Sequence, residues 1–142
     1  MSVMEGVIDH LGRPTLRIQT APPGSDSFLC LIDTGFNRYL FLERAAALRL
    51  GFLPHSKIID QIVLGDGSVK MAQVVRGSIL WFGSPLVVDA HIVPGAQHRS
   101  RYSSPEHQID GMIGTALLEG LHVFFDFQFR RVTIQRPVSS GG

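Results

Sequence analysis

Glycine and proline divide this chain into many short apolar segments, and this division limits the folds that are open to it. The sequence contains 15 Gly and 8 Pro, which together exceed the average share of roughly 12% for these two residues. Short segments of apolar or alternating residues between turn residues are typical of strands, because a helix needs a longer periodic run. The sequence therefore predicts an all-β protein with one or two short helices.

The strands are expected at Val3–Asp9, Thr15–Thr20, Ser27–Ile32, Ile58–Leu64, Val69–Val75, Ser78–Phe82, Leu86–Val93, Leu121–Phe127 and Arg131–Gln135. Gly65-Asp66-Gly67-Ser68 is a hairpin signal, because Asp-Gly readily adopts the positive φ angles of a tight turn. A helix is predicted over Glu43–Leu50, which is rich in Ala and Leu and is followed by Gly51 as its stop. A second short helix is expected over Thr115–Glu119. The polar segment Pro94–Ile109 has no apolar period and is predicted as a surface loop.

Composition excludes several classes of protein. Hydrophobic residues make up 44% of the chain and charged residues 18%, which does not fit a chain that is disordered throughout. The 13 basic and 12 acidic residues leave a net charge of +1, so neither nucleic acid nor an anionic membrane is an expected partner. The length suits a single domain over residues 1–142, with 1–6 and 137–142 as frayed ends.

Residues that would report on compartment or cofactors are few. Cys30 is the only cysteine and lies in an apolar run, so a buried thiol and no oxidising compartment are expected. The first residues lack a signal-peptide pattern, and no apolar run approaches the roughly 18 residues of a membrane span. We therefore expect a cytoplasmic protein. The six His have no metal-ligand spacing and no phosphate-binding Gly-rich loop is present, so neither a metal nor a cofactor is expected.

Three motifs stand in a fixed order along the chain. An apolar strand ends in Leu31-Ile32-Asp33-Thr34-Gly35, the Gly65–Ser68 turn follows, and Met112-Ile113-Gly114 precedes the second predicted helix. This order resembles the single-domain, retropepsin-like aspartic proteases, whose signature is an apolar pair, Asp-Thr/Ser-Gly, a flap hairpin, and a later apolar pair with Gly. The resemblance extends from Leu16 to Ile134, and Asp33–Phe36 is similar to the Asp-Thr-Gly-Phe of a bacterial-type branch. It implies a closed β-barrel-like retropepsin fold and an aspartic endopeptidase.

The chemistry of such a protease explains why its motif centres on aspartate. Two adjacent carboxylates cannot both ionise, so they share one proton and act as acid and base on a water molecule and the leaving amine. Asp33-Thr34-Gly35 is the only Asp-Thr/Ser-Gly in the chain, because Asp66-Gly67 and Asp110-Gly111 lack the hydroxyl residue. The second carboxylate must therefore come from another copy, which predicts a homodimer with its twofold axis between two Asp33 residues.

The resemblance also assigns roles around Asp33. Thr34 would interlock the two Asp loops through its hydroxyl, and Gly35 would allow a tight backbone turn below the carboxylates. Phe36 stands where the retroviral form has a small residue, so its ring would either occlude substrate or form part of a subsite. Ile113-Gly114 would thread beneath the Asp loop, and the turn with Gly65, Asp66 and Gly67 would be the tip of a flap that closes over an extended peptide.

Each of these motifs also has a purely structural interpretation. Thr34 could cap a local turn, Asp66 could serve turn chemistry, and Asp-Gly hairpins are common without any flap role. Two functions from different classes therefore remain open at this stage. One is a homodimeric endopeptidase acting on extended polypeptides, and the other is a non-catalytic module of the same fold that serves dimerisation or peptide binding. The intact Asp33-Thr34-Gly35 favours the first.

Overall fold

The computed structural model describes residues 2–22, 26–64, 66–93 and 108–138, with the backbone alone at 56–58. Its elements in chain order are β1 (Val3–Ile8), β2 (Pro14–Gln19), β3 (Ser27–Ile32), β4 (Leu40–Leu42), α1 (Arg44–Arg49), β5 (Leu53–Val63), β6 (Val69–Trp81), β7 (Ser84–Ile92), β8 (Gly111–Ile113), α2 (Thr115–Leu118), β9 (His122–Asp126) and β10 (Arg131–Gln135). Strands dominate and the two helices are short, as the sequence predicts.

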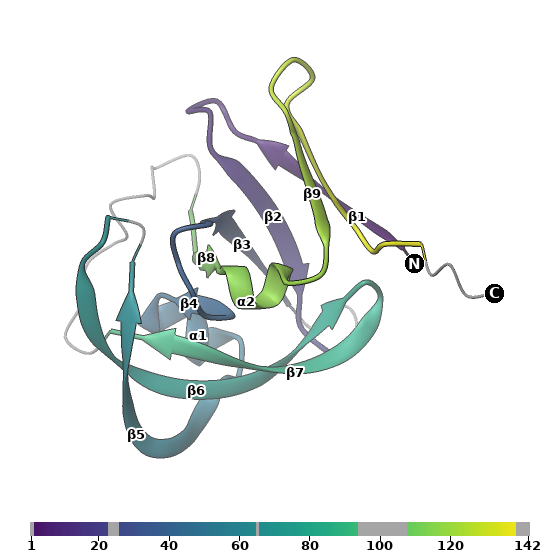
Figure 1. Cartoon of the computed structure of the whole chain (residues 1–142). Coiled ribbons are helices and arrows are strands. Elements are labelled where there is room, and N and C mark those ends of the chain that lie inside the picture. The colour runs from purple at the N-terminus through teal and green to yellow at the C-terminus, as the bar shows by residue number, and fades with distance from the viewer. Residues whose placement is uncertain (1, 23–25, 65, 94–107, 139–142) are drawn as a thin grey trace.

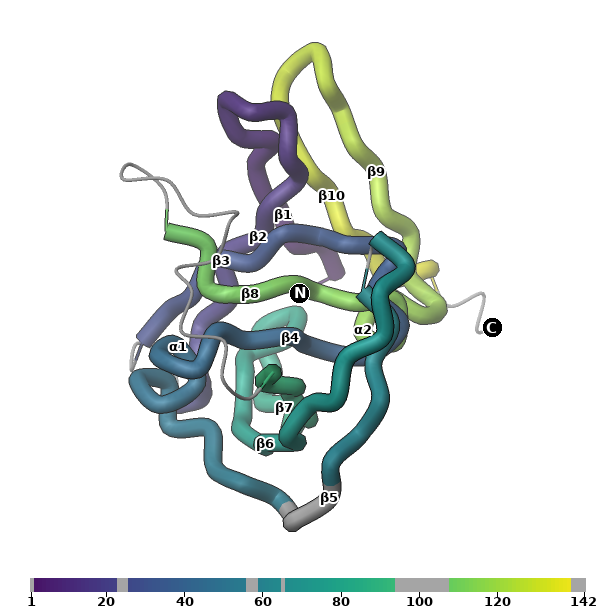
Figure 2. The backbone as a smooth tube through the Cα atoms, turned by 90° about the vertical axis from the view of Figure 1, so that its left-hand side faces the viewer, coloured from purple at the N-terminus to yellow at the C-terminus, as the bar shows by residue number. Residues whose placement is uncertain are grey.

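All strands within the described residues belong to one 10-stranded mixed sheet in the order β5-β6-β7-β4-β8-β3-β2-β1-β10-β9. Neighbours are antiparallel except for two parallel pairs, β3 with β8 and β4 with β7. The sheet is strongly bent: β5, β6 and β7 curve around one end of the molecule, and β1, β2 and β9 rise at the other (Figure 1). Figure 2 shows β8 running between β3 and β4, near the middle of the sheet.

The sheet is not closed into a barrel. Its outermost strands, β5 and β9, stand at opposite ends of the strand order and are not paired with each other. The bend does bring the end of β2 to the middle of β6, where Thr20 and Ile79 form an isolated antiparallel bridge. The Ala21 N–H also donates to the Ser78 carbonyl at 3.1 Å. Backbone pairing between the two arms of the sheet is thus limited to a few of the described residues, while their side chains share the main hydrophobic core.

Two expectations about the strands need correction. The segment from 69 to 82 was predicted as two strands divided near Gly77, but β6 runs through it without a break. Gly77 is present because of packing, since a Cβ there would lie 2.8 Å from the Phe52 ring. The strand β4 was not predicted at all, because its three residues are too few to show a period.

The ends of the chain differ from the expected loose segments. Val3–Val7 pairs with β10 along five residues, so most of the stretch 1–6 is held in the sheet. Residues 136–138 follow β10 outside any strand. Residues 139–142, and most of the predicted loop 94–109, lie outside the described residues.

The strand β3 is buried on both faces, which explains its continuous apolar sequence. Phe28, Cys30 and Ile32 face the main hydrophobic core. The side chain of Leu31 points to the opposite face of the sheet. There it belongs to a second core cluster with Phe36, Ile62, Ala72, Ile109 and Met112. Cys30 is fully buried, and burial raises the pKa of its thiol well above the ordinary value. This strand ends at Asp33 and fixes the position of the residues that follow.

Candidate active site

Asp33 begins a tight turn at the end of β3. Its N–H donates to the Ile113 carbonyl at 2.9 Å, and its carbonyl accepts from the Phe36 N–H at 3.2 Å. The side-chain Oδ1 accepts from the Gly35 N–H at 2.9 Å, which is the hydrogen bond of an Asx turn. Asp33 is partly exposed, and Oδ2 has no hydrogen-bond partner among the described residues. One carboxylate oxygen is therefore held by the turn and the other is available.

The strand β8 supports this turn from below. Its partner strands are β3 on one side and β4 on the other, with Ile32 and Leu40 both opposite Ile113. At Gly114 the chain passes so close to the loop that a Cβ would lie 2.0 Å from the Arg38 carbonyl oxygen. Only glycine allows this approach. The Ile113-Gly114 segment thus packs under the Asp33 loop, an arrangement that both the catalytic and the structural interpretations predicted.

The first turn of α2 fastens the far side of the same loop. The Thr115 N–H donates to the Phe36 carbonyl at 2.8 Å, and the Gly114 N–H donates to the Tyr39 carbonyl at 3.0 Å. The Thr115 hydroxyl donates to the same Phe36 carbonyl at 3.3 Å. Residues 33–39 are therefore held at both ends by one short segment, Ile113–Thr115, that lies about 80 positions later in the chain.

Thr34 and Gly35 lie at the exposed top of the turn. Within the described part of the chain the Thr34 hydroxyl makes no hydrogen bond, so local capping has no contact to support it. Thr34 faces an open depression of ≈ 590 Å³. Its walls also include Asn37 from the loop, Glu119 after α2, and Leu121 and Val123 at the start of β9. The Asp33 loop and β9 thus share one surface.

Phe36 points inward. Its side chain is fully buried, with its ring edge-to-face against Phe41 at 6.4 Å and against His91 at 6.5 Å between centroids. It belongs to the second core cluster with Ile62 of β5 and Ala72 of β6. The buried ring offers no surface to a ligand, whereas the sequence predicts that it either occludes substrate or forms part of a subsite. It packs the Asp33 loop against the inner face of the β5–β6 hairpin.

The β5–β6 hairpin carries the predicted flap turn at its tip. Gly65 lies outside the described residues. The Asp66 carboxylate accepts from the Ser68 N–H at 2.9 Å, so this side chain has a turn role. Gly67 has φ +83°, a conformation that favours glycine, and its N–H donates to the Leu64 carbonyl. Asp66 and Gly67 are both exposed.

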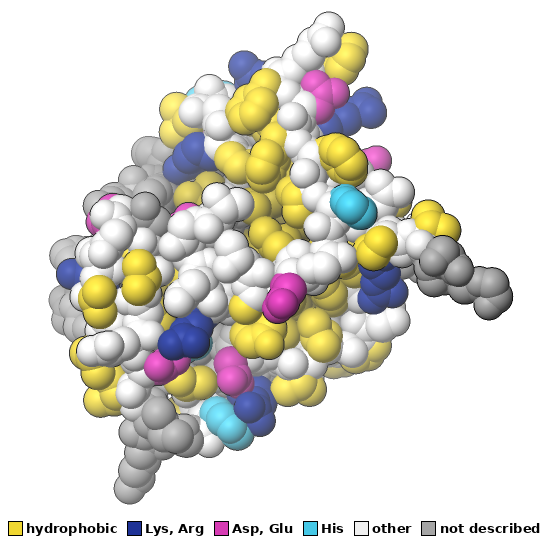
Figure 3. Space-filling view, in the orientation of Figure 1, with side chains coloured by type: hydrophobic (Ala, Val, Ile, Leu, Met, Phe, Trp, Pro, Cys, Tyr) yellow, Lys and Arg dark blue, Asp and Glu magenta, His cyan; other side chains and the backbone are white. Residues whose placement is uncertain are grey.

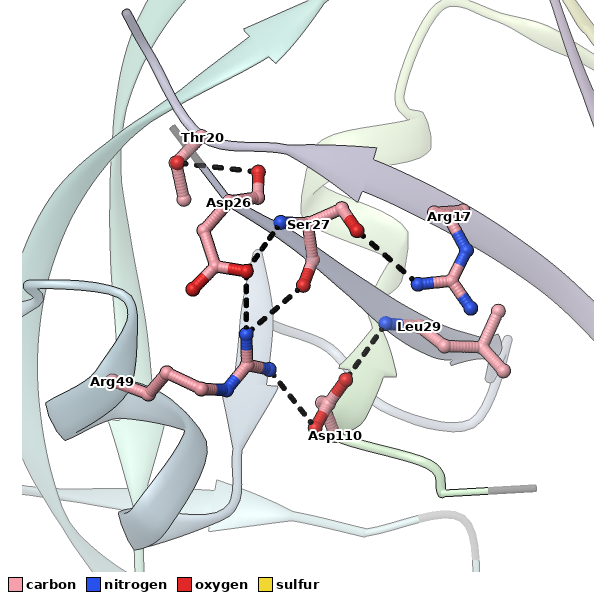
Figure 4. A network of polar contacts seen from close by, with 7 residues as sticks. All are labelled: Arg17, Thr20, Asp26, Ser27, Leu29, Arg49 and Asp110. Carbon is pink, nitrogen blue, oxygen red and sulfur yellow. Dashed lines mark hydrogen bonds and ion pairs between the residues drawn. The ribbon is translucent and has the colours of Figure 1, made fainter. Parts of the chain in front are cut away.

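Asp110 cannot complete a pair with Asp33. Its Oδ2 accepts from the Leu29 N–H at 2.9 Å, and Arg49 of α1 lies 3.3 Å from its Oδ1 (Figure 4). Because Cys30 lies opposite Gly111 in the parallel ladder, Asp110 sits near the beginning of β3 and Asp33 at its end. At about 3.3 Å per residue this places the two acids roughly 13 Å apart. Arg49 also holds Asp26 at 2.7 Å, so this partly exposed group joins α1 to the start of β3.

One cluster near the loop was not predicted. Arg38 lies 3.3 Å from Asp60 of β5, and His91 of β7 lies 3.0 Å from the other oxygen of the same carboxylate. The hydrogen bond from His91 is the main cause that lowers the pKa of Asp60. The sequence contained one signal, a single histidine within the apolar strand Leu86–Val93, but nothing in the pattern named its partners.

No family model and no curated protein sequence matches this chain at a significant level. Over the part of the chain that the structure describes, no group of three or more His, Cys, Asp or Glu could hold a metal ion. No described helix has the length and apolar character needed to cross a bilayer. Assignment of a function must therefore come from the geometry of the Asp33 loop and its surroundings.

Proposed function

We propose that this protein is a homodimeric aspartic endopeptidase of the retropepsin type, in which two Asp33 carboxylates from two copies form the catalytic pair. The observation that carries the proposal is the Asp33 carboxylate itself. It is partly exposed on a turn held at both ends, and one of its oxygens has no partner among the described residues. Asp110, an acid of the second apolar-Gly motif, is engaged elsewhere. A second copy supplies the missing carboxylate.

The two carboxylates act on an extended peptide through a bound water. The ionised carboxylate removes a proton from the water as it attacks the peptide carbonyl, and the protonated one supports the developing charge and supplies the proton of the leaving amine. No covalent intermediate with the enzyme forms. Thr34, beside the axis, interlocks the two loops, while the β5–β6 hairpin closes over the substrate and excludes water.

The strand β9 is the surface best suited to the second copy. It is the outermost strand next to β10, and Phe124 and Phe125, which point to opposite faces of the sheet, are both exposed. Phe127 and Phe129 in the turn after the strand are exposed as well. Figure 3 shows hydrophobic side chains gathered over this upper part of the molecule. Exposed apolar edge strands invite pairing with another chain.

Its sequence is also complementary to itself. If two β9 strands pair antiparallel about Phe124, His122 of one copy lies opposite the partner's Asp126, and Val123 lies opposite the partner's Phe125. At roughly 200 Å² per aromatic ring, the exposed parts of the four Phe amount to about 450 Å² per copy, or about 900 Å² for two. This is a large share of the roughly 1,200–2,000 Å² in a stable interface.

A peptide-library digestion tests the proposal. Wild type should cleave extended peptides at mildly acidic pH, and Asp33→Asn should lower the rate by about 10²- to 10⁴-fold, because an amide cannot act as the base. Asp89→Asn, the same chemical change at a surface ion pair, is the matched control and should leave the rate unchanged. Equal cleavage by wild type and purified Asp33→Asn would refute the catalytic role.

The second candidate is a non-catalytic module that binds peptides or dimerises. One observation favours it, since the Asp33 Oδ1 bond to the Gly35 N–H is a structural role that needs no chemistry. Peptides that bind without being cleaved, with the same affinity for wild type and Asp33→Asn, would select this function. With a single cysteine, buried and without a disulfide partner, we place either activity in the cytoplasm.

A further inference from the structure

The loop that carries Asp33 is joined to the β5–β6 hairpin by a polar contact as well as by Phe36. Arg38 follows Asp33 by five positions. Its Nη2 donates to the Asp60 carboxylate at 3.3 Å and to the Gln61 carbonyl at 3.1 Å. Both acceptors lie on β5, just before Val63 at the end of that strand. A single guanidinium therefore connects the Asp33 loop to one strand of the hairpin.

His91 holds the opposite side of the same carboxylate. It is buried on β7, and its Nε2 lies 3.0 Å from Asp60 Oδ2. Because an ionised carboxylate only accepts hydrogen bonds, the Nε2 atom must carry the proton. Asp60 thus bridges a cation on the loop and a ring on the interior strand. The ring of Phe36 meets His91 edge-to-face from the loop side, so the polar and apolar contacts are continuous.

The hairpin projects beyond β7 just past these contacts, because β7 pairs with β6 only from Gln73 onward. Ile62 and Ala72 are fully buried beside Phe36. Toward the tip, Leu64 is partly buried against the same cluster, whereas Val63, Val69 and Met71 on the outer face are exposed. Segments with few buried contacts open locally more readily than the rest of a fold. The Arg38–Asp60–His91 cluster therefore lies where the hairpin begins to project beyond β7.

We propose that Arg38, Asp60 and His91 form a charged hinge that fixes the base of the flap to the Asp33 loop, so that closure of the flap and the geometry of that loop are coupled. These are positioning residues that act through Phe36 and the loop backbone. The inference rests on the proposed function of Asp33, because it describes how the flap of that same site is held.

The electrostatics fit a hinge that works in acid. The hydrogen bond from His91 and the charge of Arg38 keep the pKa of Asp60 below its ordinary value. Asp60 therefore stays ionised at mildly acidic pH, where a pair of carboxylates that shares a proton is active. A neutral group at this position would lose the ion pair under the conditions in which the flap has to close.

Amide hydrogen exchange of Asp60→Asn tests the coupling. Loss of a partly exposed ion pair should speed exchange about three- to fivefold at the hairpin amides of Leu64 and Gly67. The same acceleration should occur at the loop amides of Phe36 and Thr115. The control is Asp89→Asn, which breaks the similarly exposed Arg76–Asp89 pair on β6 and β7 and should leave all four amides unchanged. Acceleration at the hairpin alone would overturn the proposal.

A second variant keeps the test decisive if Asp60→Asn fails to fold. Arg38→Gln removes the cation and leaves Asp60 and His91 in place, so it should reproduce the acceleration at Leu64, Gly67, Phe36 and Thr115. If both variants fold and neither moves the loop amides, the hinge is wrong.

Peptide cleavage then separates the two proposals. If wild type is a peptidase, the hinge variants should raise KM severalfold more than they lower kcat, because binding of an extended peptide depends on the flap. Coupled exchange in a protein without peptidase activity would leave the hinge standing and refute the proposed function. Peptidase activity without coupled exchange would support the proposed function and refute the hinge.

Discussion

The two hairpins at the ends of the sheet expose apolar side chains in different settings. The β5–β6 hairpin is held on its inner face by Ile62, Ala72 and a charged cluster, and its outer face exposes apolar side chains from Ile59 to the turn. In the β9–β10 hairpin, Val132 and Ile134 are fully buried along the inner strand, while β9 presents phenylalanines on both faces. Exposure on a hairpin that projects beyond β7 fits movement, and exposure along a strand whose neighbour is buried fits a partner.

The largest expected effect comes from placing a charge on each exposed strand. Phe124 is 56% exposed and Val69 is 58% exposed, so the two are a matched pair. Phe124→Asp should raise the dimer Kd about 100-fold, because it removes an aromatic contact and places two like charges across the axis. Val69→Asp should leave association unchanged. Sedimentation analysis at several concentrations measures both, and equal behaviour of the two variants would remove the distinction between the hairpins.

Mixing wild-type and Asp33→Asn chains tests whether two copies of the chain share the catalytic pair. If the chains are refolded together as random dimers, a half-and-half mixture should keep about one quarter of the activity of the same amount of wild type, because only dimers with two carboxylates work. A chain that works alone would keep about half. A linear loss of activity across the mixing series would end the shared-pair hypothesis.

Two glycines test whether the β5–β6 hairpin opens locally, with a smaller expected effect. Gly67 (φ +83°) in the flap turn and Gly120 (φ +77°) before β9 both have open space where a Cβ would be placed. Alanine at either position adds similar backbone strain, about 1 kcal/mol. Gly120→Ala should lower the global unfolding free energy by that amount in denaturant titration. Gly67→Ala should lower it by less, because the flap tip opens locally. Equal losses would mean that the flap unfolds only with the whole protein.

Acidification is expected to have the smallest effect, a loss of hydrogen-exchange protection in the β5–β6 hairpin. Hydrogen bonding to His91 lowers the pKa of Asp60 below 3.8, so its contribution is complete above that pH and is lost as the pH falls through the lower, folded-state value. Hydrogen exchange at Leu64 and Gly67, corrected for the intrinsic rate, should therefore lose protection only below pH 3.8. In Asp60→Asn this acid step should be absent. Asp9 and Asp26 have lowered pKa values as well, so global acid unfolding alone is not the readout.

Local signals explain which parts of the fold were predictable. Ser27–Ile32 was predicted with the bounds of β3, because a strand buried on both faces is a continuous apolar run. Helix α1 and the β9–β10 hairpin also follow from their own residues. Gly77 was misleading, since glycine marks a turn in most sequences, whereas here it makes room for the Phe52 ring.

The candidate site likewise has one part that the local sequence predicts and one part that it does not. Asp33, Thr34 and Gly35 form a turn whose geometry is encoded in three adjacent residues. The inward orientation of Phe36 and the Arg38–Asp60–His91 cluster depend on contacts between segments that are far apart in sequence. A pattern along the chain carries no information about such partners. The role of Asp33 as a catalyst stays a prediction.

The parallel pairing of β3 with β8 also governs when the Asp33 loop can form. The ladder joins Cys30–Ile32 to Gly111–Ile113, and the hydrogen bonds that fix residues 33–39 come from Ile113, Gly114 and Thr115. During synthesis from the N-terminus, Asp33 leaves the ribosome long before these partners exist. The loop therefore stays unassembled until nearly the whole described chain has emerged, and such long-range pairing is intrinsically slow. An incomplete chain that lacks Ile113–Thr115 therefore cannot hold Asp33 in its assembled turn.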